Sequence, residues 1–248
     1  MKEFTPCRKC SEGRFPGYIL IDGLLNPCNC YKKWHEENIV RVRAKKANIV
    51  LPDNYNIDTS YLGTKSVDSI KRLKTFLSKL DEDDQETKDK LLKTTLYFYG
   101  PNGTQKTTVA NWFGTELIKR EYKVKYILMN NLIKLLVDYE RSEEAQLEIE
   151  KIKKCDAIIL DEALDQHKIT IYKSSYQIPF LDSFLREVIG NKIILFVSNV
   201  NIKDIDENYF SSSIKDLVTR NVLLRKALLE FYDNYFDTAS DIDVEDLF

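Results

Sequence analysis

A glycine-rich segment near the middle of the chain has the residue types of a phosphate-binding loop. It reads GPNGTQKTT, and Lys106 and Thr107 stand where a helix is expected to begin. In such a loop the backbone N–H groups and the positive end of the helix dipole face a β-phosphate. The lysine reaches the β- and γ-phosphates and the hydroxyl ligates Mg²⁺. The residues expected to contact the nucleotide are Gly100, Asn102, Gly103, Thr104, Gln105, Lys106, Thr107 and Thr108.

One position of this loop departs from the G-x-x-x-x-G-K-[ST] pattern. Gln105 stands where a glycine normally precedes the lysine. Its side chain must point away from the nucleotide, or the loop must adopt different dihedral angles. We therefore expect a weaker grip on the nucleotide rather than loss of binding. Taken alone, the segment is also compatible with an ordinary glycine-rich turn.

Two adjacent carboxylates end an apolar run that lies beyond the loop. Ala157 to Leu160 is followed by Asp161 and Glu162, and Asp161 lies 55 residues after Lys106. We expect Asp161 to hold the Mg²⁺ shell and Glu162 to polarise the attacking water. A buried strand with a polar end would show the same residues. The order of the two motifs favours a nucleotide site, because ligands of open parallel sheets bind at the carboxyl ends of strands.

Two further polar residues are candidates for the same site. Asn199 follows the apolar run 193–197 and is expected to contact the γ-phosphate or the water, although strands also end in Asn for turn formation. Arg220 precedes a short apolar run, 222–224, that we expect to be the fifth strand. An arginine there is either a surface group or an arginine finger for a neighbouring subunit. The second interpretation requires self-association through Arg220.

Four of the five cysteines lie within the first thirty residues, in two close pairs. Cys7 and Cys10 form a C-x₂-C pair, and Cys28 and Cys30 form a C-x-C pair. Four thiolates suit tetrahedral Zn²⁺, with His35 as a possible substitute ligand. A redox dithiol or unligated cysteines are the alternatives. Since so short a segment buries little apolar surface, we expect it to need the metal to fold.

From residue 95 onward, short apolar runs alternate with stretches of helical periodicity. The expected strands are 95–99, 124–129, 157–160, 193–197 and 222–224, and the expected helices are about 106–120, 131–152, 180–189, 211–218 and 225–236. Near-continuous apolar strands that alternate with helices indicate a parallel sheet covered on both faces. The predicted fold class is α/β, a three-layer P-loop NTPase core with a five-stranded parallel sheet, preceded by a small zinc-binding module.

The composition divides the chain into four parts. Residues 1–46 form the zinc module with a basic helix, 47–94 a linker and entry to the core, 95–236 the ATPase core, and 237–248 an acidic tail. The linker contains the segment LPDNY, which is expected to be a turn, and then an amphipathic stretch. The acidic run DEDDQE follows and is expected to be an exposed loop. The tail mixes acidic and apolar residues, so it is either a docking peptide for a basic groove or a solvated segment.

The location of the protein is also constrained. No apolar run approaches the roughly 18 residues of a membrane span, so no membrane partner is expected. The first residues lack the apolar stretch of a signal peptide. We expect the protein to be made and kept in the cytoplasm.

Taken together, these motifs resemble those of the DnaC/DnaI-type helicase loaders and, by extension, of the IstB-like transposition ATPases of the AAA+ class. The resemblance rests on GPNGTQKTT, AIILDEA, the segment SNVN and the run that ends at Arg220, together with the cysteine-rich head and minimal lid. It covers about residues 5–236. It implies a phage-encoded or bacterial ATPase that uses ATP, Mg²⁺ and Zn²⁺, grips a hexameric replicative helicase through its N-terminal module, and assembles on single-stranded DNA in replication initiation.

The resemblance also implies roles for single residues. Lys106 and Thr107 become the nucleotide-loop residues, Asp161 the metal residue and Glu162 the water residue. Asn199 becomes the first sensor and Arg220 the trans-acting finger. The aromatic and basic residues of the segment after Glu162 either stack on unpaired bases or pack within their own loop; these are Tyr172, Lys173 and Tyr176.

Two departures from the family pattern keep other functions open. Gln105 is one, and the other is the final predicted helix, which offers no second-sensor arginine except the distant Arg225. Slow hydrolysis or a switch-like use of ATP is therefore expected. The alternatives are an ATPase helper of a transposase and a non-hydrolysing adaptor that uses ATP only as a folding ligand.

Overall fold

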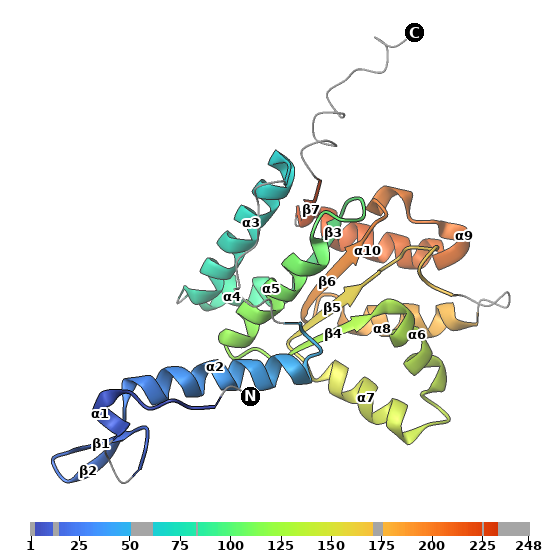
Figure 1. The fold of residues 1–248 in the computed structure, drawn as a ribbon. Coiled ribbons are helices and arrows are strands. Elements are labelled where there is room, and N and C mark those ends of the chain that lie inside the picture. Colours follow the sequence, from blue (N-terminus) through green and yellow to red (C-terminus); the bar gives the residue numbers. More distant parts are fainter. Residues whose placement is uncertain are drawn as a thin grey trace.

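The structure, a computed structural model, describes residues 3–11, 15–50, 62–82, 84–170, 176–224 and 226–232. It consists of an α/β core and a small cysteine-bearing module at the far end of a long helix (Figure 1). The predictions for LPDNY, Tyr172, Lys173, Arg225 and the acidic tail lie outside these residues. Across the part of the chain that the structure describes, none of the helices has the length and apolar composition needed to traverse a bilayer.

Five parallel strands form the central sheet in the order β4-β5-β6-β3-β7. Their bounds are β3 Thr95–Tyr99, β4 Val124–Leu128, β5 Ala157–Asp161, β6 Ile193–Ser198 and β7 Leu228–Glu230. The three central strands β3, β5 and β6 are buried along nearly their whole length, which matches their continuous apolar sequences. This order places β6 between the strand of the phosphate loop and the strand of the two carboxylates.

Helices cover both faces of the sheet, so the three-layer prediction is confirmed. One face is covered by α6 Met129–Asp138, α8 Gln177–Val188 and α10 Ser212–Leu224, and the other by α3 Thr64–Asp81 and α5 Lys106–Lys119. Alternate strand residues enter the two clusters, as the pleat requires: Tyr97 and Phe196 face the first, Phe98 and Val197 the second. The remaining short helices are α4 Gln85–Leu91, α7 Glu143–Lys153, α9 Glu207–Phe210 and the 3₁₀ turn η1 Ile202–Asp204.

The prediction for the end of the core was wrong. Residues 222–224 belong to α10 rather than to a strand, because Ile214, Val218 and Val222 continue one buried helical stripe with a spacing of four. The fifth strand is β7, which lies in the region 225–236 predicted to be helical. Three residues that read LLE carry too short a pattern to be distinguished from a helix by periodicity.

Two other boundaries differ from the predicted ones. The single helix expected over 131–152 is two helices, because the Ser142 side chain accepts a hydrogen bond from the N–H of Ala145 and starts α7. The acidic run is not all loop, because Asp81 ends α3 and the Asp84 side chain caps α4. In both places an N-cap residue within a polar stretch was overlooked.

The N-terminal module consists of α1 Arg8–Ser11, a hairpin of β1 Tyr18–Ile21 and β2 Leu24–Pro27, and the start of α2 Asn29–Lys46. The far end of α2 reaches the sheet (Figure 1). There the helix closes with Asn48 at a positive φ of 60°, and the N–H of Ile49 bonds to the carbonyl of Ala44 at 2.9 Å. This glycine-like cap turns the chain onto the edge of the sheet beside β4.

Candidate nucleotide site and zinc centre

The phosphate loop connects β3 to α5 at the carboxyl edge of the sheet. Gly100 has φ of 152°, and a Cβ there would lie 1.8 Å from the carbonyl oxygen of Phe231, so only glycine fits. Gly103 also has a positive φ, 87°. Gln105 has φ of 61° and ψ of 12°, the left-handed conformation that glycine adopts freely. Gln105 therefore adopts the backbone conformation of the glycine that it replaces, at a cost on the order of 1–2 kcal/mol.

Lys106 begins α5 and its side chain is folded over the loop. Its ammonium donates to the carbonyl oxygens of Gly100 at 2.7 Å and Pro101 at 2.6 Å. The side chain is buried, and this desolvation lowers its pKa to about 8, while the charge of Asp161 partly opposes the shift. An ammonium held by neutral carbonyls in a buried site is well placed to accept an anionic ligand.

The predicted magnesium residues, Thr107 and Asp161, are in direct contact. The Thr107 hydroxyl donates to Oδ2 of Asp161 at 3.0 Å, and the backbone N–H of Glu162 donates to Oδ1 at 2.8 Å. The Tyr126 hydroxyl also donates to Oδ2. A hydroxyl and a carboxylate on facing elements provide the hard oxygen ligands that Mg²⁺ prefers, so these residues fit the ion.

The two candidate groups for the attacking water follow β5 and β6. Glu162 has φ of 52° and pairs with Lys168 at 3.7 Å. The Asn199 amide donates to Oδ2 of Asp165 at 3.2 Å, and the other oxygen of this carboxylate accepts from the N–H of His167 at 2.9 Å. Asp165 is buried and fixes the orientation of Asn199, yet nothing in its sequence context distinguishes it from an ordinary loop residue.

These side chains surround one cavity of about 340 Å³. It is lined by Asn102, Gly103, Thr104, Gln105, Lys106, Thr107, Thr108, Asp161, Glu162, Lys168, Val197, Ser198 and Asn199. The structure thus brings the loop, both carboxylates and Asn199 together from three strand ends. Lys168 was missed by sequence reasoning, because a lysine in a polar loop carries no signal of its own.

Arg220 is the one predicted catalytic residue that does not line this cavity. It lies within α10 rather than immediately before a strand, and its side chain is exposed. Across the ranges that the structure describes, its guanidinium forms no hydrogen bond or ion pair. It is therefore accessible to a second molecule.

The core resembles solved structures of replication proteins. A search finds DnaA from Aquifex aeolicus bound to AMPPCP (TM-score 0.56, 17% identity), matching 77% of this chain but only 55% of that one. The DnaC helicase loader (TM-score 0.52, 14% identity) matches 73% of this chain and 98% of that one. DnaI (TM-score 0.54, 16% identity) matches 74% and 96%. No protein-family model and no curated protein sequence matches the chain.

The chain has the AAA+ fold. The sequence prediction of a DnaC- and DnaI-like AAA+ core is confirmed at the level of the fold. At these low identities the likeness extends to the arrangement of helices and strands and to nothing finer.

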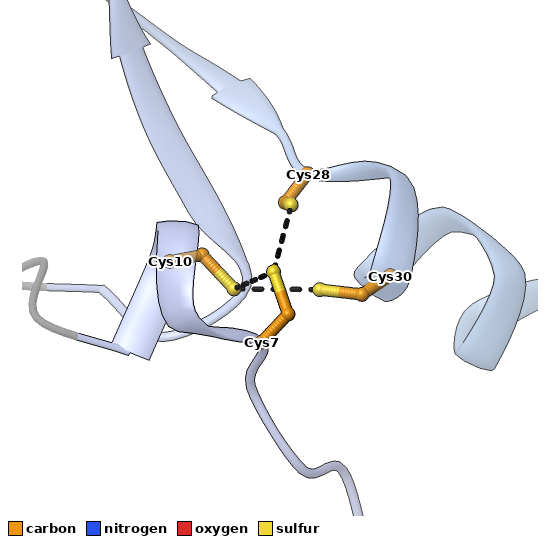
Figure 2. A group of neighbouring side chains, drawn as sticks. All are labelled: Cys7, Cys10, Cys28 and Cys30. Atoms are coloured by element: carbon orange, nitrogen blue, oxygen red, sulfur yellow. Dashed lines mark hydrogen bonds between the residues drawn. The ribbon is translucent and has the colours of Figure 1, made fainter.

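Ahead of the AAA+ core, the four N-terminal cysteines converge on one point (Figure 2). Cys7 precedes α1 and Cys10 lies in it, whereas Cys28 is the N-cap residue of α2 and Cys30 lies in the first turn of that helix. The Sγ distances are 3.8 Å for Cys7–Cys10, 3.7 Å for Cys7–Cys28 and 3.3 Å for Cys10–Cys30, and all four sulfurs lie within 4.8 Å of one another. A Zn–S distance of about 2.3 Å in a tetrahedron gives sulfurs roughly 3.8 Å apart, so the cluster fits Zn²⁺.

The surroundings of the cluster support ligation by the cysteines alone. The backbone N–H of Lys9 donates to the Cys7 thiol and is the main reason that its pKa falls to about 7, which favours the thiolate. His35 is not part of the group; its ring instead stacks on Tyr31, with centroids 5.9 Å apart. Tyr31 also contacts Phe4 and Trp34. The module thus has an aromatic cluster and a metal-sized cysteine cluster in place of a large core.

We predict that the purified chain holds close to one equivalent of zinc and that Cys28→Ser reduces this to well below half. The reason is that three thiolates bind Zn²⁺ less tightly than four. Affinity should also fall as the pH is lowered, because each thiol must lose its proton. Elemental analysis provides the measurement. Cys155→Ser, outside the cluster, is the matched control and should keep its full zinc content. If the two variants hold equal amounts of zinc, the four N-terminal cysteines are not the zinc site.

We also predict that Mg·ATP binding takes up much more of a proton at pH 8.5 than at pH 7. Lys106 is mostly charged at pH 7, loses its proton as the pH rises through about 8, and regains it when phosphate binds. The Kd for Mg·ATP should therefore rise up to about tenfold per pH unit above 8. Calorimetry in two buffers of different ionisation enthalpy measures the uptake. Lys106→Arg, which stays charged, should show no uptake; identical behaviour of the two proteins would contradict the assignment.

Proposed function

We propose that this chain is an ATP-dependent loader of a replicative DNA helicase, acting on single-stranded DNA in replication initiation. The observation that carries the proposal is the convergence of Lys106, Thr107, Asp161, Glu162 and Asn199 on one cavity. Each comes from the carboxyl edge of the sheet, and together they provide the positive charge, metal ligands and water-orienting groups that phosphoryl transfer needs.

The proposed chemistry assigns one task to each group. Lys106 exchanges the carbonyls of Gly100 and Pro101 for phosphate oxygens, and Thr107 and Asp161 hold Mg²⁺, which neutralises phosphate charge when bound. Glu162 accepts the hydrogen bond of the attacking water. Asn199, whose amide is held by Asp165, donates to the γ-phosphate or to that water.

The pairing of Glu162 with Lys168 bears on the rate. The two groups are 3.7 Å apart, and this partner competes with the attacking water for the carboxylate. Lys168 also lines the cavity, so phosphate charge would draw it away from Glu162. The basal rate of hydrolysis is therefore expected to be low, as the strained Gln105 also implies.

The fold of the core and the presence of an N-terminal cysteine module favour a loader over another AAA+ activity. The fold likeness covers nearly the whole of the DnaC helicase loader and of DnaI. A DnaA structure with a similar fold was solved with single-stranded DNA bound. In this chain α2 places the cysteine module away from the core, and we propose that the module binds the partner (Figure 1).

The hairpin of this module is the proposed docking surface for the helicase. Its outer residues are strongly exposed although aliphatic: Leu20 at 70%, Ile21 at 48%, Leu24 at 71% and Leu25 at 52%. They form two cross-strand pairs on opposite faces of the hairpin, Leu20 with Leu25 and Ile21 with Leu24. Exposed aliphatic pairs on both faces of a two-stranded hairpin are typical of a protein-binding segment. The zinc cluster at the base of the hairpin would hold this surface rigid.

Self-association is the second proposed interaction. Arg220 is exposed on α10, outside its own cavity, and lacks a partner within the described ranges. In an assembly of copies packed side by side it would neutralise phosphate charge in the neighbouring site. An alternative function, a non-hydrolysing adaptor, is favoured by the Glu162–Lys168 pair and by Gln105.

We predict that Glu162→Gln lowers ATP turnover at least about a hundredfold, because it removes the carboxylate that polarises the water, and leaves Mg·ATP binding intact. Turnover is measured with single-stranded DNA and a hexameric helicase present. Arg220→Ala should be equally slow, and mixing the two variants should restore part of the rate, since each supplies what the other lacks. Equal turnover by Glu162→Gln and the unmodified chain would favour the adaptor.

We further predict that the double change Leu20→Asp and Leu24→Asp weakens binding of the replicative helicase at least about tenfold, because it puts one charge into each of the two exposed aliphatic pairs. Co-purification and surface-immobilised binding of the two full-length proteins provide the measurement. Zinc content and Mg·ATP affinity should not change. Leu147→Asp, at an equally exposed leucine of α7 (62%), is the matched control. Unchanged capture of the helicase would exclude the hairpin as its docking surface.

A further inference from the structure

The end of α2 is joined to the ATPase core at one edge of the sheet. The carbonyl of Ala47 accepts a hydrogen bond from the N–H of Tyr126 at 2.7 Å, and the Asn48 amide donates to the Tyr126 carbonyl at 3.5 Å. Tyr126 lies on β4, the edge strand, whose outer side pairs with no other strand in the part of the chain that the structure describes. Residues 47 and 48, a turn that follows α2, thus cover part of this edge.

The side chain of the same tyrosine reaches the magnesium site. Its hydroxyl donates to Oδ2 of Asp161, the oxygen that also accepts from Thr107. Burial and the neighbouring Asp161 raise the pKa of Tyr126, so its hydroxyl keeps the proton that it donates. One residue therefore contacts the end of α2 with its backbone and the metal-binding carboxylate with its side chain.

A second residue makes the same kind of double contact. The side-chain oxygen of Asn111 accepts from the N–H of Val50 at 2.8 Å. Its amide nitrogen donates to the carbonyl of Thr107 at 2.8 Å. Asn111 lies one turn after Thr107 on α5 and is buried. The segment after α2 is therefore linked to both expected magnesium ligands, through two separate hydrogen-bonded paths.

Close packing between these two paths makes the joint stiff. Ile49 is 5% exposed and lies over Gly114 of α5, where an added Cβ would be 2.5 Å from its Cδ1. The same Cβ would lie 2.9 Å from Cδ1 of Ile159, on β5. The Ile49 side chain fits between α5 and β5 because residue 114 is a glycine. In so tightly packed a place, Ile49 cannot shift without moving the neighbouring residues that make the hydrogen bonds.

We propose that Tyr126 and Asn111 are positioning residues that couple the orientation of α2 to the geometry of the magnesium site. The inference rests on the proposed ATPase function. With 18 residues, α2 is a lever of about 27 Å whose far end carries the cysteine module. A partner that tilts this lever acts on Asp161 through Tyr126 and on Thr107 through Asn111.

The coupling must be reciprocal. If the docked position of α2 favours bound Mg²⁺, then bound Mg²⁺ favours the docked position of α2 by the same free energy. Engagement of the module by a partner therefore changes the affinity for Mg·ATP, and Mg·ATP changes the affinity for the partner. The module is in this way a regulator of the nucleotide site as well as a docking element.

The first test compares Tyr126→Phe with Tyr122→Phe in the full chain. Tyr122 precedes the same strand, and its hydroxyl makes no hydrogen bond within the described residues. The Mg²⁺ concentration for half-maximal ATP binding should rise roughly three- to tenfold in Tyr126→Phe, the size of one net hydrogen bond, and stay constant in Tyr122→Phe. ATP binding in EDTA should be the same for both. A purely structural role would shift thermal stability without this magnesium-specific effect.

The second test follows amide hydrogen exchange, which needs no turnover. The N–H groups of Val50 and Tyr126 should exchange at least about threefold more slowly with Mg·ATP than with ATP in EDTA, and the effect at Tyr126 should disappear in Tyr126→Phe at the same position. The coupling is overturned if either the magnesium requirement or the protection of these amides stays unchanged. If the unmodified chain binds no ATP at all, the proposed function fails instead, so the two failures are distinct.

Discussion

The buried carboxylate of Asp161 is the point on which the nucleotide site depends. It is 5% exposed, and a buried charge without partners would cost several kcal/mol. Its two oxygens accept from Thr107 on α5, from Tyr126 on β4 and from the backbone that follows β5. These donors come from three segments that meet only in the folded core. The site is thus preorganised by the same contacts that satisfy the charge, and a magnesium ion would find its ligands already oriented.

The parts of this arrangement that were predictable are those encoded over short distances. Strands β3 to β6 could be predicted because each is a short run rich in apolar residues, and the loop residues because their spacing is local. The order β4-β5-β6-β3-β7 then places Asn199 between the loop and the carboxylates. Tyr126, Asn111, Asp165 and Lys168 were not predicted, because their roles arise from contacts between elements far apart in the chain.

The errors have the same physical origin. α10 extends over 222–224 because its buried stripe continues there, whereas β7 is a strand because it pairs with β3. Neither fact is visible in three or four residues. In the N-terminal module the cysteine spacing indicated a four-sulfur cluster, but the hairpin between the pairs was not foreseen. Its aliphatic residues face solvent, contrary to the usual inference that apolar strands are buried.

Three features of the site bear on the rate of hydrolysis expected under the proposed function. Gln105 is held in a glycine-like conformation, Lys106 bonds to its own loop, and Glu162 pairs with Lys168. The carbonyl bonds of Lys106 stabilise the nucleotide-free state, and the Glu162–Lys168 pair would compete with an attacking water, each by an amount on the order of 1 kcal/mol. The left-handed conformation of Gln105 instead costs the loop about 1–2 kcal/mol. Free energies of this size are no larger than the coupling free energy, about 1–3 kcal/mol, by which binding at one site typically affects another. Under the proposed function, these weak interactions would keep hydrolysis slow, and the contacts of Tyr126 and Asn111 with the end of α2 would let a partner of the N-terminal module change them.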